Sequence, residues 1–120
     1  MQLLRKLFGK QRGRERLMVE LPVLIGGSGG DENRFMTADL SETGLRMDIT
    51  GVASPGDLTR GSRSVALAIV LAEDQDPVSV YGELIWTKPE EDGKQFSGWM
   101  FCDYPGDSRD RLAEFVRERI

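Results

Sequence analysis

The sequence predicts a mostly β protein: a small six-stranded antiparallel β-barrel with a C-terminal helix and a short basic N-terminal arm or helix. Several short segments alternate apolar and polar residues, which is the pattern of strands that bury one face. Turn-forming segments separate these strands, and after Pro105 and Gly106 the apolar residues follow helical spacing. A chain of 120 residues has the size of one compact domain with its own core.

The basic arm is predicted over residues 1–11, and the barrel domain over residues 12–120. Within MQLLRKLFGK the apolar residues lie on one side at helical spacing, and the basic residues lie elsewhere. Such a segment docks on its own domain or frays, or else it lies on a membrane or a partner protein. Its apolar positions are Leu3, Leu4, Leu7 and Phe8.

Three strands are predicted in the first half of the barrel domain. Residues 17–25 are apolar at every odd position, as in a half-buried strand. The glycine-rich GGSGGDEN then forms a hairpin-like turn and not a Walker loop, because no Gly-Lys-Ser/Thr follows it. Residues 34–38 lead as a second strand into DLSETG, and residues 45–49 alternate again as a third. Residues 52–61 have the composition of a loop.

Three more strands and the helix complete the domain. Residues 64–72 predict a strand buried on both faces, although their alanines and leucines also suit a helix. Residues 78–87 and 95–104 are predicted to pair as a hairpin around KPEEDG, with Trp86 and Trp99 as core aromatics. The closing helix is predicted to be capped by Asp107 or Ser108 and to present Leu112, Phe115, Val116 and Ile120 on one face.

Charge is unevenly distributed along the chain. The first 16 residues carry six Lys or Arg and one acid, a net charge of +5, whereas the remaining ten bases and nineteen acids give −9. A basic arm on an acidic body indicates a small or local anionic partner, because a general nucleic-acid binder has a wider basic face. We therefore expect no nucleic-acid polymer as partner.

Cysteine and histidine usage excludes several kinds of site. The chain has no histidine, which excludes Ser-His-Asp and Cys-His catalysis and every His-ligated metal site. The single cysteine, Cys102, allows no internal disulfide and fits a reducing cytoplasm. It alternates with Phe96, Gly98 and Met100, which predicts a buried structural thiol. No apolar run is long enough to span a bilayer and no signal peptide is recognisable, so we expect a cytoplasmic protein without a transmembrane segment.

Two short segments carry candidate binding chemistry. Arg12 and Arg16 stand four residues apart in QRGRER, and Asp39, Ser41 and Gly44 follow in DLSETG. Alone, the first is typical of a solvated basic tail, and the second of a plain β-turn in which the glycine takes a left-handed conformation. Together they describe a guanine nucleotide site. Guanidinium groups bind phosphate and the O6/N7 edge of guanine, and a carboxylate accepts the hydrogens of guanine N1 and N2.

These segments resemble the two motifs of the PilZ domain, a bacterial receptor module for cyclic di-GMP (c-di-GMP). RxxxR stands here as R12-G-R-E-R16, and [D/N]xSxxG stands as D39-L-S-E-T-G44. The following LMVELPV and the late strand SGWMF agree with the family, and the resemblance covers roughly residues 10–120. It implies a six-stranded barrel that binds its ligand at the mouth.

The resemblance also implies roles for individual residues. Arg12 and Arg16 would hold phosphate and guanine, while Asp39, Ser41 and Gly44 would shape the second guanine contact. Further candidates are Gln11, which stands where some relatives have another arginine, Arg14 inside the first motif, and Gly98 in the closing strand.

The function expected from these observations is that of a non-enzymatic sensor and adaptor. Binding of cyclic di-GMP would order the basic arm against the barrel and create a surface for an effector protein that the sequence does not identify. The alternative is a PilZ-type adaptor that does not bind nucleotide and acts through protein contacts in motility, pilus function or secretion. An enzyme is not expected, because no base, nucleophile or metal cluster is recognisable, and neither cofactor nor metal is predicted.

Overall fold

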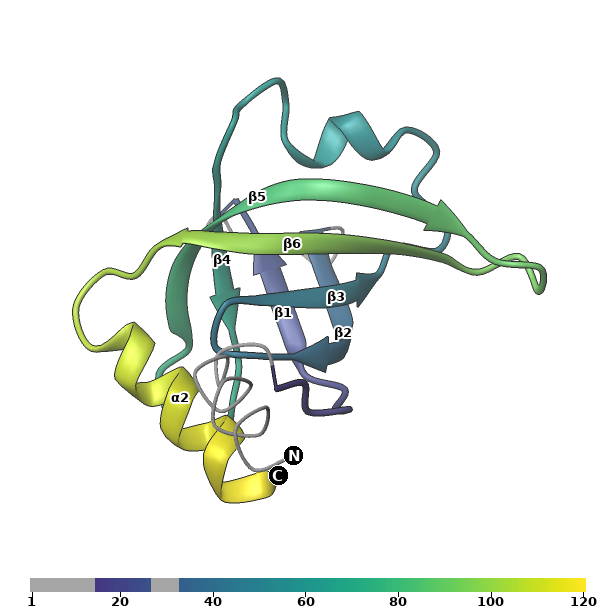
Figure 1. The fold of residues 1–120 in the computed structure, drawn as a ribbon. Coiled ribbons are helices and arrows are strands. Elements are labelled where there is room, and N and C mark those ends of the chain that lie inside the picture. Colours follow the sequence, from purple (N-terminus) through teal and green to yellow (C-terminus); the bar gives the residue numbers. More distant parts are fainter. Residues whose placement is uncertain (1–14, 27–32) are drawn as a thin grey trace, which may run out of the picture.

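The computed structural model describes residues 15–26 and 33–120. The predicted amphipathic arm and most of the predicted GGSGGDEN turn lie outside the described residues. The described chain forms six antiparallel strands that close into a barrel, with one C-terminal α-helix at one end of it (Figure 1). The barrel with a closing helix that alternation and turn composition predict is therefore confirmed.

The strands are β1 (Pro22–Ile25), β2 (Arg34–Leu40), β3 (Gly44–Asp48), β4 (Val65–Ile69), β5 (Val78–Pro89) and β6 (Gln95–Asp103). They follow one another around the barrel in the order β1, β2, β3, β6, β5, β4, and β4 pairs with β1 to close it. A short 3₁₀ helix, η3 (Pro55–Leu58), lies within the predicted loop between β3 and β4, and α2 (Ser108–Arg119) follows β6. No helix in the described part of the chain is long and apolar enough to cross a membrane.

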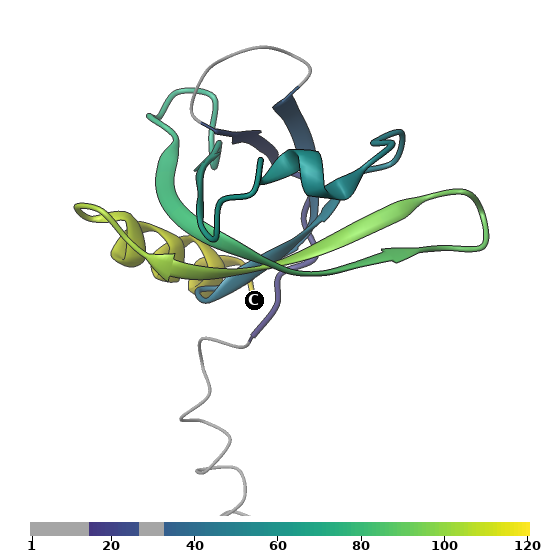
Figure 2. The ribbon, with the colours of Figure 1, turned by 90° about the horizontal axis from the view of Figure 1, so that it is seen from above.

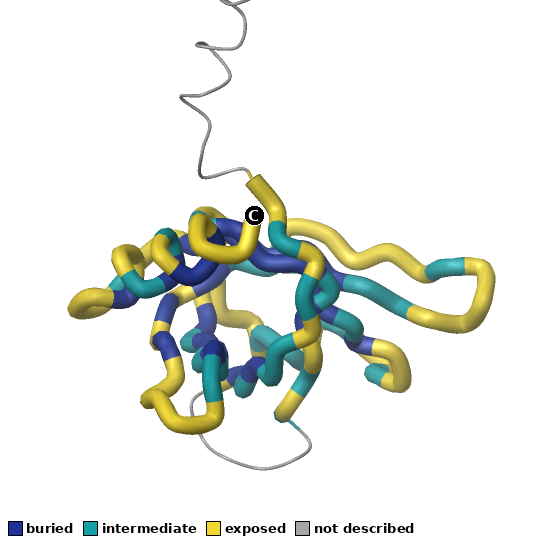
Figure 3. The backbone as a smooth tube through the Cα atoms, turned by 90° about the horizontal axis from the view of Figure 1, so that it is seen from below, coloured by how far each residue is buried: buried dark blue, intermediate teal, exposed yellow. Residues whose placement is uncertain are grey.

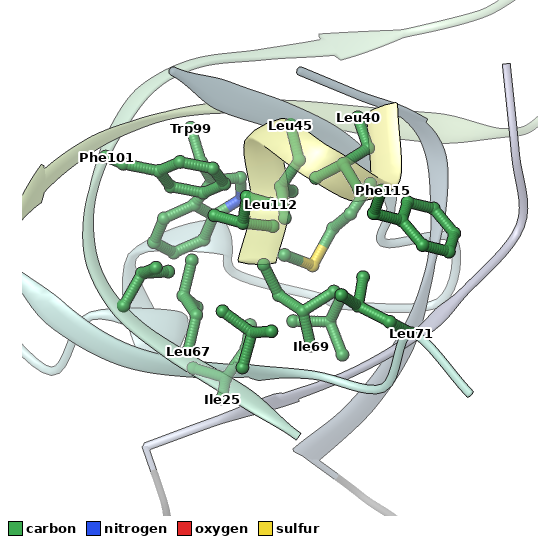
Figure 4. Close-up of a cluster of buried hydrophobic side chains, with 14 of the residues drawn as sticks. Ile25, Leu40, Leu45, Leu67, Ile69, Leu71, Trp99, Phe101, Leu112 and Phe115 are labelled. Atoms are coloured by element: carbon green, nitrogen blue, oxygen red, sulfur yellow. The ribbon is translucent and has the colours of Figure 1, made fainter. Parts of the chain in front are cut away.

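One hydrophobic core fills the barrel (Figure 4). In β4, Val65, Leu67 and Ile69 are buried and the alanines between them are half-buried. This period of two is that of a strand, and it settles the choice between strand and helix that composition leaves open. Burial follows the inner side of the barrel and the side of α2 that faces it, while the outer turns are exposed (Figure 3). The helix contributes Leu112, Phe115 and Val116 to the core.

The β5–β6 hairpin is confirmed, but it carries only one of the two predicted core tryptophans. Trp99 is 3% exposed, whereas Trp86 is 42% exposed. The pairing register shifts between Leu84 and Trp86, because β5 accommodates an extra residue there. A one-residue shift moves the following side chain to the other face of a sheet. Trp86 therefore points outward, on a hairpin that extends beyond the barrel (Figure 2).

The prediction of a buried thiol is wrong, because Cys102 is exposed. The buried side chains of β6 are those of Ser97, Trp99 and Phe101, so the even-numbered residues after Gly98 point outward. The sequence alternates in both phases here, since apolar residues occupy odd and even positions alike. Burial of the large ring of Trp99 in the barrel decides between them.

Two element ends also differ from the predictions. The first strand begins at Pro22 and not at residue 17. Residues 17–21 are held to β2 by a backbone bridge between Leu17 and Leu40 and by a hydrogen bond from Thr37 N to Leu21 O at 2.9 Å. The Thr37 hydroxyl adds two more, since it accepts from Leu21 N and donates to Val19 O. The helix ends at Arg119, and the following Ile120 is 60% exposed instead of joining the buried face. Asp107 occupies the N-cap without a side-chain hydrogen bond.

Candidate functional site

A β-bulge in β2 places Asp39 on the outer face of the barrel beside Arg46. The pairing register of β2 with β3 shifts between Thr37 and Asp39, which adds one residue to β2. Thr37 and Leu40 are both buried in the barrel, so the residue just before Leu40 points outward. Asp39 is paired there with Arg46 of β3.

Two arginines share the carboxylate of Asp39. The Oδ1 atom accepts a hydrogen bond from Arg16 Nη1 at 2.7 Å, and the Oδ2 atom accepts one from Arg46 Nε at 3.1 Å. The side chain of Asp39 is only 6% exposed, whereas those of Arg16 and Arg46 are 55% and 32% exposed. A carboxylate this buried needs such partners, because burying an unpaired charge is costly. The guanidinium of Arg46 also lies over the ring of Phe96, 5.2 Å from its centre.

The Ser41 side chain makes its hydrogen bonds within its own turn. Its hydroxyl oxygen accepts hydrogen bonds from Thr43 N at 3.2 Å and Gly44 N at 3.1 Å, and its hydroxyl lies 3.1 Å from Gly44 O. The residue is 1% exposed. Ser41 therefore fixes the shape of the turn between β2 and β3, as a serine in an ST-turn does.

Gly44 is required for close packing and not for a left-handed turn. The described glycines with positive φ are Gly26, Gly51, Gly61, Gly93 and Gly106, so the predicted left-handed conformation of Gly44 is wrong. A Cβ atom at Gly44 would lie 2.3 Å from the carbonyl oxygen of Trp99 on the neighbouring strand. The glycine thus allows two backbones to approach each other, which is the other common reason for this residue.

Gly98 forms the floor of the same outer surface. It pairs with Arg46 of β3 on one side and with Trp86 of β5 on the other. A Cβ atom here would lie 2.2 Å from the indole of Trp86, so the missing side chain lets the indole lie against β6. Ile85 and Met100 are 54% and 48% exposed beside it. Together these residues form an apolar surface next to the arginines.

An open cavity of about 600 Å³ lies here on the outside of the barrel. This volume lies within the range typical of sites for small ligands. One part of the lining is charged and the other is apolar. The lining residues are Arg16, Asp39, Thr43, Gly44, Leu45, Arg46, Ile85, Trp86, Gly98, Trp99 and Met100.

The structure brings four of the predicted site residues to this cavity: Arg16, Asp39, Gly44 and Gly98. Ser41 lies behind it in the turn that carries Gly44. The remaining three, Gln11, Arg12 and Arg14, lie outside the described residues.

Arg46 and Trp86 line the cavity but were not predicted as site residues. Arg46 has a recognisable signal, since it is the outward position of the alternating LRMDI strand, two residues after the motif glycine. Alternation places Trp86 in the core instead, because the bulge that turns it outward leaves no clear mark in the sequence. Ile85 is the extra residue of that bulge. Met100 has a different cause, since alternation in β6 does not show which of its two phases points outward.

A comparison with protein families matches residues 10–118 to the family described as PilZ domain. This match covers nearly the whole chain and includes every residue named above for the cavity. A comparison with curated proteins gives no match.

Solved structures show the same fold at low sequence identity. The inhibitor of motility MotI/DgrA of Bacillus subtilis is 16% identical with a TM-score of 0.69, over 87% of this chain and 48% of that chain. The PlzA protein of Borreliella burgdorferi, solved in complex with c-di-GMP, is 10% identical with a TM-score of 0.59, over 97% and 56%. The PilZ domain of CeSA from a cellulose-synthesizing bacterium is 14% identical with a TM-score of 0.53, over 87% and 96%. The chain thus spans about half the length of the first two proteins.

Proposed function

The chain belongs to the PilZ domain family, a family of cyclic di-GMP receptors, and from this premise we propose that it binds cyclic di-GMP in the cavity on the outer face of β3, β5 and β6. The observation that carries the proposal is the contact between the two motifs. Arg16 from the first and Asp39 from the second, 23 residues apart, meet at 2.7 Å at the edge of a cavity of suitable size. A nucleotide of this kind offers two phosphates and two guanines to such a surface.

The guanidinium groups supply the anion-binding part. Within the described part of the chain, hydrogen bonds engage only Nη1 of Arg16 and only Nε of Arg46. Each guanidinium has five N–H donors in a fixed plane, so most of them are left for a ligand. Phosphate oxygens and the O6/N7 edge of guanine both match this donor pattern. Arg12 of the first motif is proposed to join Arg16 in this role.

Asp39 has two candidate roles. In the first, it accepts the hydrogens of guanine N1 and N2 through the second lone pairs of its oxygens. In the second, it only orients Arg16 and Arg46, whose hydrogen bonds already occupy both oxygens. The first role makes binding specific for guanine, and the second makes it depend mainly on phosphate.

Trp86 supplies a surface for a base. Its exposed indole, with Ile85 and Met100 beside it, lies across Gly98 from Arg46. A nucleobase that stacks on an aromatic ring gains roughly 1–3 kcal/mol. The cavity therefore offers an apolar face for a base next to donors for the phosphates.

Signalling would then pass to a protein partner. A bound nucleotide neutralises the charge of the arginines and covers the apolar surface, so the face of the barrel changes in both charge and shape. We propose that an effector protein recognises this changed face. No catalytic step is proposed, because ligand binding and partner recognition account for the residues in the cavity.

Isothermal titration calorimetry with two dinucleotides tests the proposal. Cyclic di-GMP should bind, and cyclic di-AMP, which lacks the N1 and N2 hydrogens, should bind on the order of a thousandfold more weakly. Equal affinities would limit Asp39 to orienting the arginines. No binding of either dinucleotide would overturn the proposal and favour the adaptor that acts through protein contacts alone.

A further inference from the structure

The turn between β2 and β3 is held from the C-terminal segment. The Tyr104 hydroxyl donates a hydrogen bond to the backbone oxygen of Glu42 at 2.7 Å. The Nε atom of Arg109 lies 3.2 Å from Oε1 of the same glutamate. These partners lie 62 and 67 residues beyond Glu42 in the chain. Two groups from one segment thus hold both the backbone and the side chain of a single turn residue.

Tyr104 is itself fixed in position. Its ring packs edge-on against Phe101, with ring centres 5.9 Å apart, and the guanidinium of Arg109 lies over it at 5.3 Å. Burial raises the pKa of Tyr104, although the nearby Arg109 acts in the opposite direction. The phenol therefore keeps its proton at neutral pH and remains a hydrogen-bond donor to Glu42.

The position of Arg109 is not explained by the helix. Arg109 is the second residue of α2 (Ser108–Arg119), where the helix dipole favours acidic side chains and disfavours cations. The carboxylate of Glu42, 23% exposed, offsets this charge. Residues that go against a local preference are expected mainly at strained or functional sites. The contact with Glu42 is what this position of Arg109 provides.

The turn has two sides with different neighbours. Thr43 and Gly44 line the cavity, whereas Glu42 does not, and neither do Tyr104 and Arg109. The turn is stiff, because Ser41 bonds to the amides of Thr43 and Gly44 and to the backbone of Gly44. Phe101 N also donates to Thr43 O at 2.8 Å. These bonds connect the cavity side of the turn to Glu42, so a displacement of either is expected to shift the other.

We propose that Tyr104 and Arg109 are positioning residues of the nucleotide site, and that occupancy of the cavity and docking of α2 on the turn favour each other. This inference rests on the proposed function. By linkage, if the docked helix strengthens nucleotide binding, the nucleotide strengthens helix docking by the same factor. Nucleotide binding in the cavity would then change how firmly the N-terminal end of α2 is held against the turn.

Three variants test this inference in the whole chain. Tyr104→Phe removes only the hydroxyl, and Arg109→Gln removes the charge that meets Glu42. Arg117→Gln, an exposed residue in the last turn of the same helix, is the matched control. The first readout is amide hydrogen exchange of residues 41–44 without ligand, and the second is the affinity for cyclic di-GMP by calorimetry.

We expect Tyr104→Phe and Arg109→Gln to exchange faster in the turn and to bind cyclic di-GMP about fivefold or more weakly, while the control matches the wild type. Arg109→Lys, which keeps the charge, should bind closer to the wild type than Arg109→Gln. Unchanged turn exchange in both variants overturns the positioning role, whether or not the nucleotide binds. Faster exchange with unchanged affinity overturns the coupling and leaves the proposed function intact. If the wild type itself does not bind, the proposed function and the coupling both fail, and the turn exchange still decides whether Tyr104 and Arg109 hold the turn.

Discussion

The two tryptophans of the β5–β6 hairpin lie on opposite faces of the same sheet. Trp99 points into the barrel, is 3% exposed, and donates its Nε1 hydrogen to Ser97 Oγ at 2.8 Å. Trp86 points outward, is 42% exposed, and lies over Gly98. The first is a large buried ring with its polar atom satisfied, as a core requires. The second leaves apolar surface in water beside two arginines.

This difference separates stability from binding along one wall of the barrel. The inward residues of β3, Leu45 and Met47, are buried, while the outward Arg46 between them reaches Asp39. Inward positions fill a fixed volume, so their replacement should destabilise the fold. The outward apolar surface around Trp86 adds little to the core and is of the kind that marks binding sites. Substitutions on the two faces should therefore affect different measurements.

The largest expected effect belongs to the inner face. Trp99→Ala should lower the free energy of unfolding by about 3–5 kcal/mol, because it removes a buried ring and leaves a cavity. The measurement is urea denaturation followed by circular dichroism. Trp86→Ala is the paired variant and should change stability by less than about 1 kcal/mol. A similar loss of stability in both variants would contradict the division between the faces.

On the outer face, Arg46→Ala should weaken cyclic di-GMP binding by about 2–4 kcal/mol, because a charge-assisted contact is lost. Arg16→Ala should act in the same way. Calorimetry measures both, and circular dichroism checks the fold. Arg34→Ala is the matched control, since Arg34 is exposed on β2 and does not line the cavity. Equal affinities of Arg46→Ala and Arg34→Ala for cyclic di-GMP would show that Arg46 does not bind the nucleotide.

A smaller effect is expected when alanine replaces either of two glycines, Gly44 or Gly98. Gly44→Ala should destabilise the fold by about 1–3 kcal/mol, because its methyl group would meet the backbone oxygen of Trp99 at 2.3 Å. Gly98→Ala should cost less, since its methyl group would meet the indole of Trp86, which can swing outward. Thermal unfolding ranks the two variants. The reverse order would show that the indole of Trp86 is held more firmly than its exposure indicates.

Much of the barrel could be predicted from period-two alternation, because each strand buries one face. The prediction failed where register shifts, since the bulge before Trp86 inserts a residue that alternation alone does not reveal. It also failed for Cys102, where apolar residues in both phases of β6 left the inner face undecided. Only the space inside the closed barrel selects Trp99 over its neighbours.

The site was predictable in part. The spacing of the motifs identified Arg16 and Asp39, which meet in the structure. The role expected of Gly44 rested on turn geometry and was wrong, because its neighbour Trp99 comes from a strand 55 positions later. Arg46 stands at an outward position of an alternating strand, but its contact with Asp39 depends on the bulge in β2. Contacts between strands depend on the pairing register, which local patterns do not supply.

The indole Nε1–H signals of the two tryptophans offer the most direct test of the central claim, that the outer face of this wall binds the nucleotide. A two-dimensional ¹⁵N–¹H spectrum shows one indole peak for each ring, and Trp86→Phe identifies which is which. Titration with cyclic di-GMP should shift the Trp86 peak in a saturable way and leave the Trp99 peak in place, since Trp99 stays bonded to Ser97 inside the barrel. A titration that moves neither peak, or moves Trp99 and not Trp86, would contradict the account.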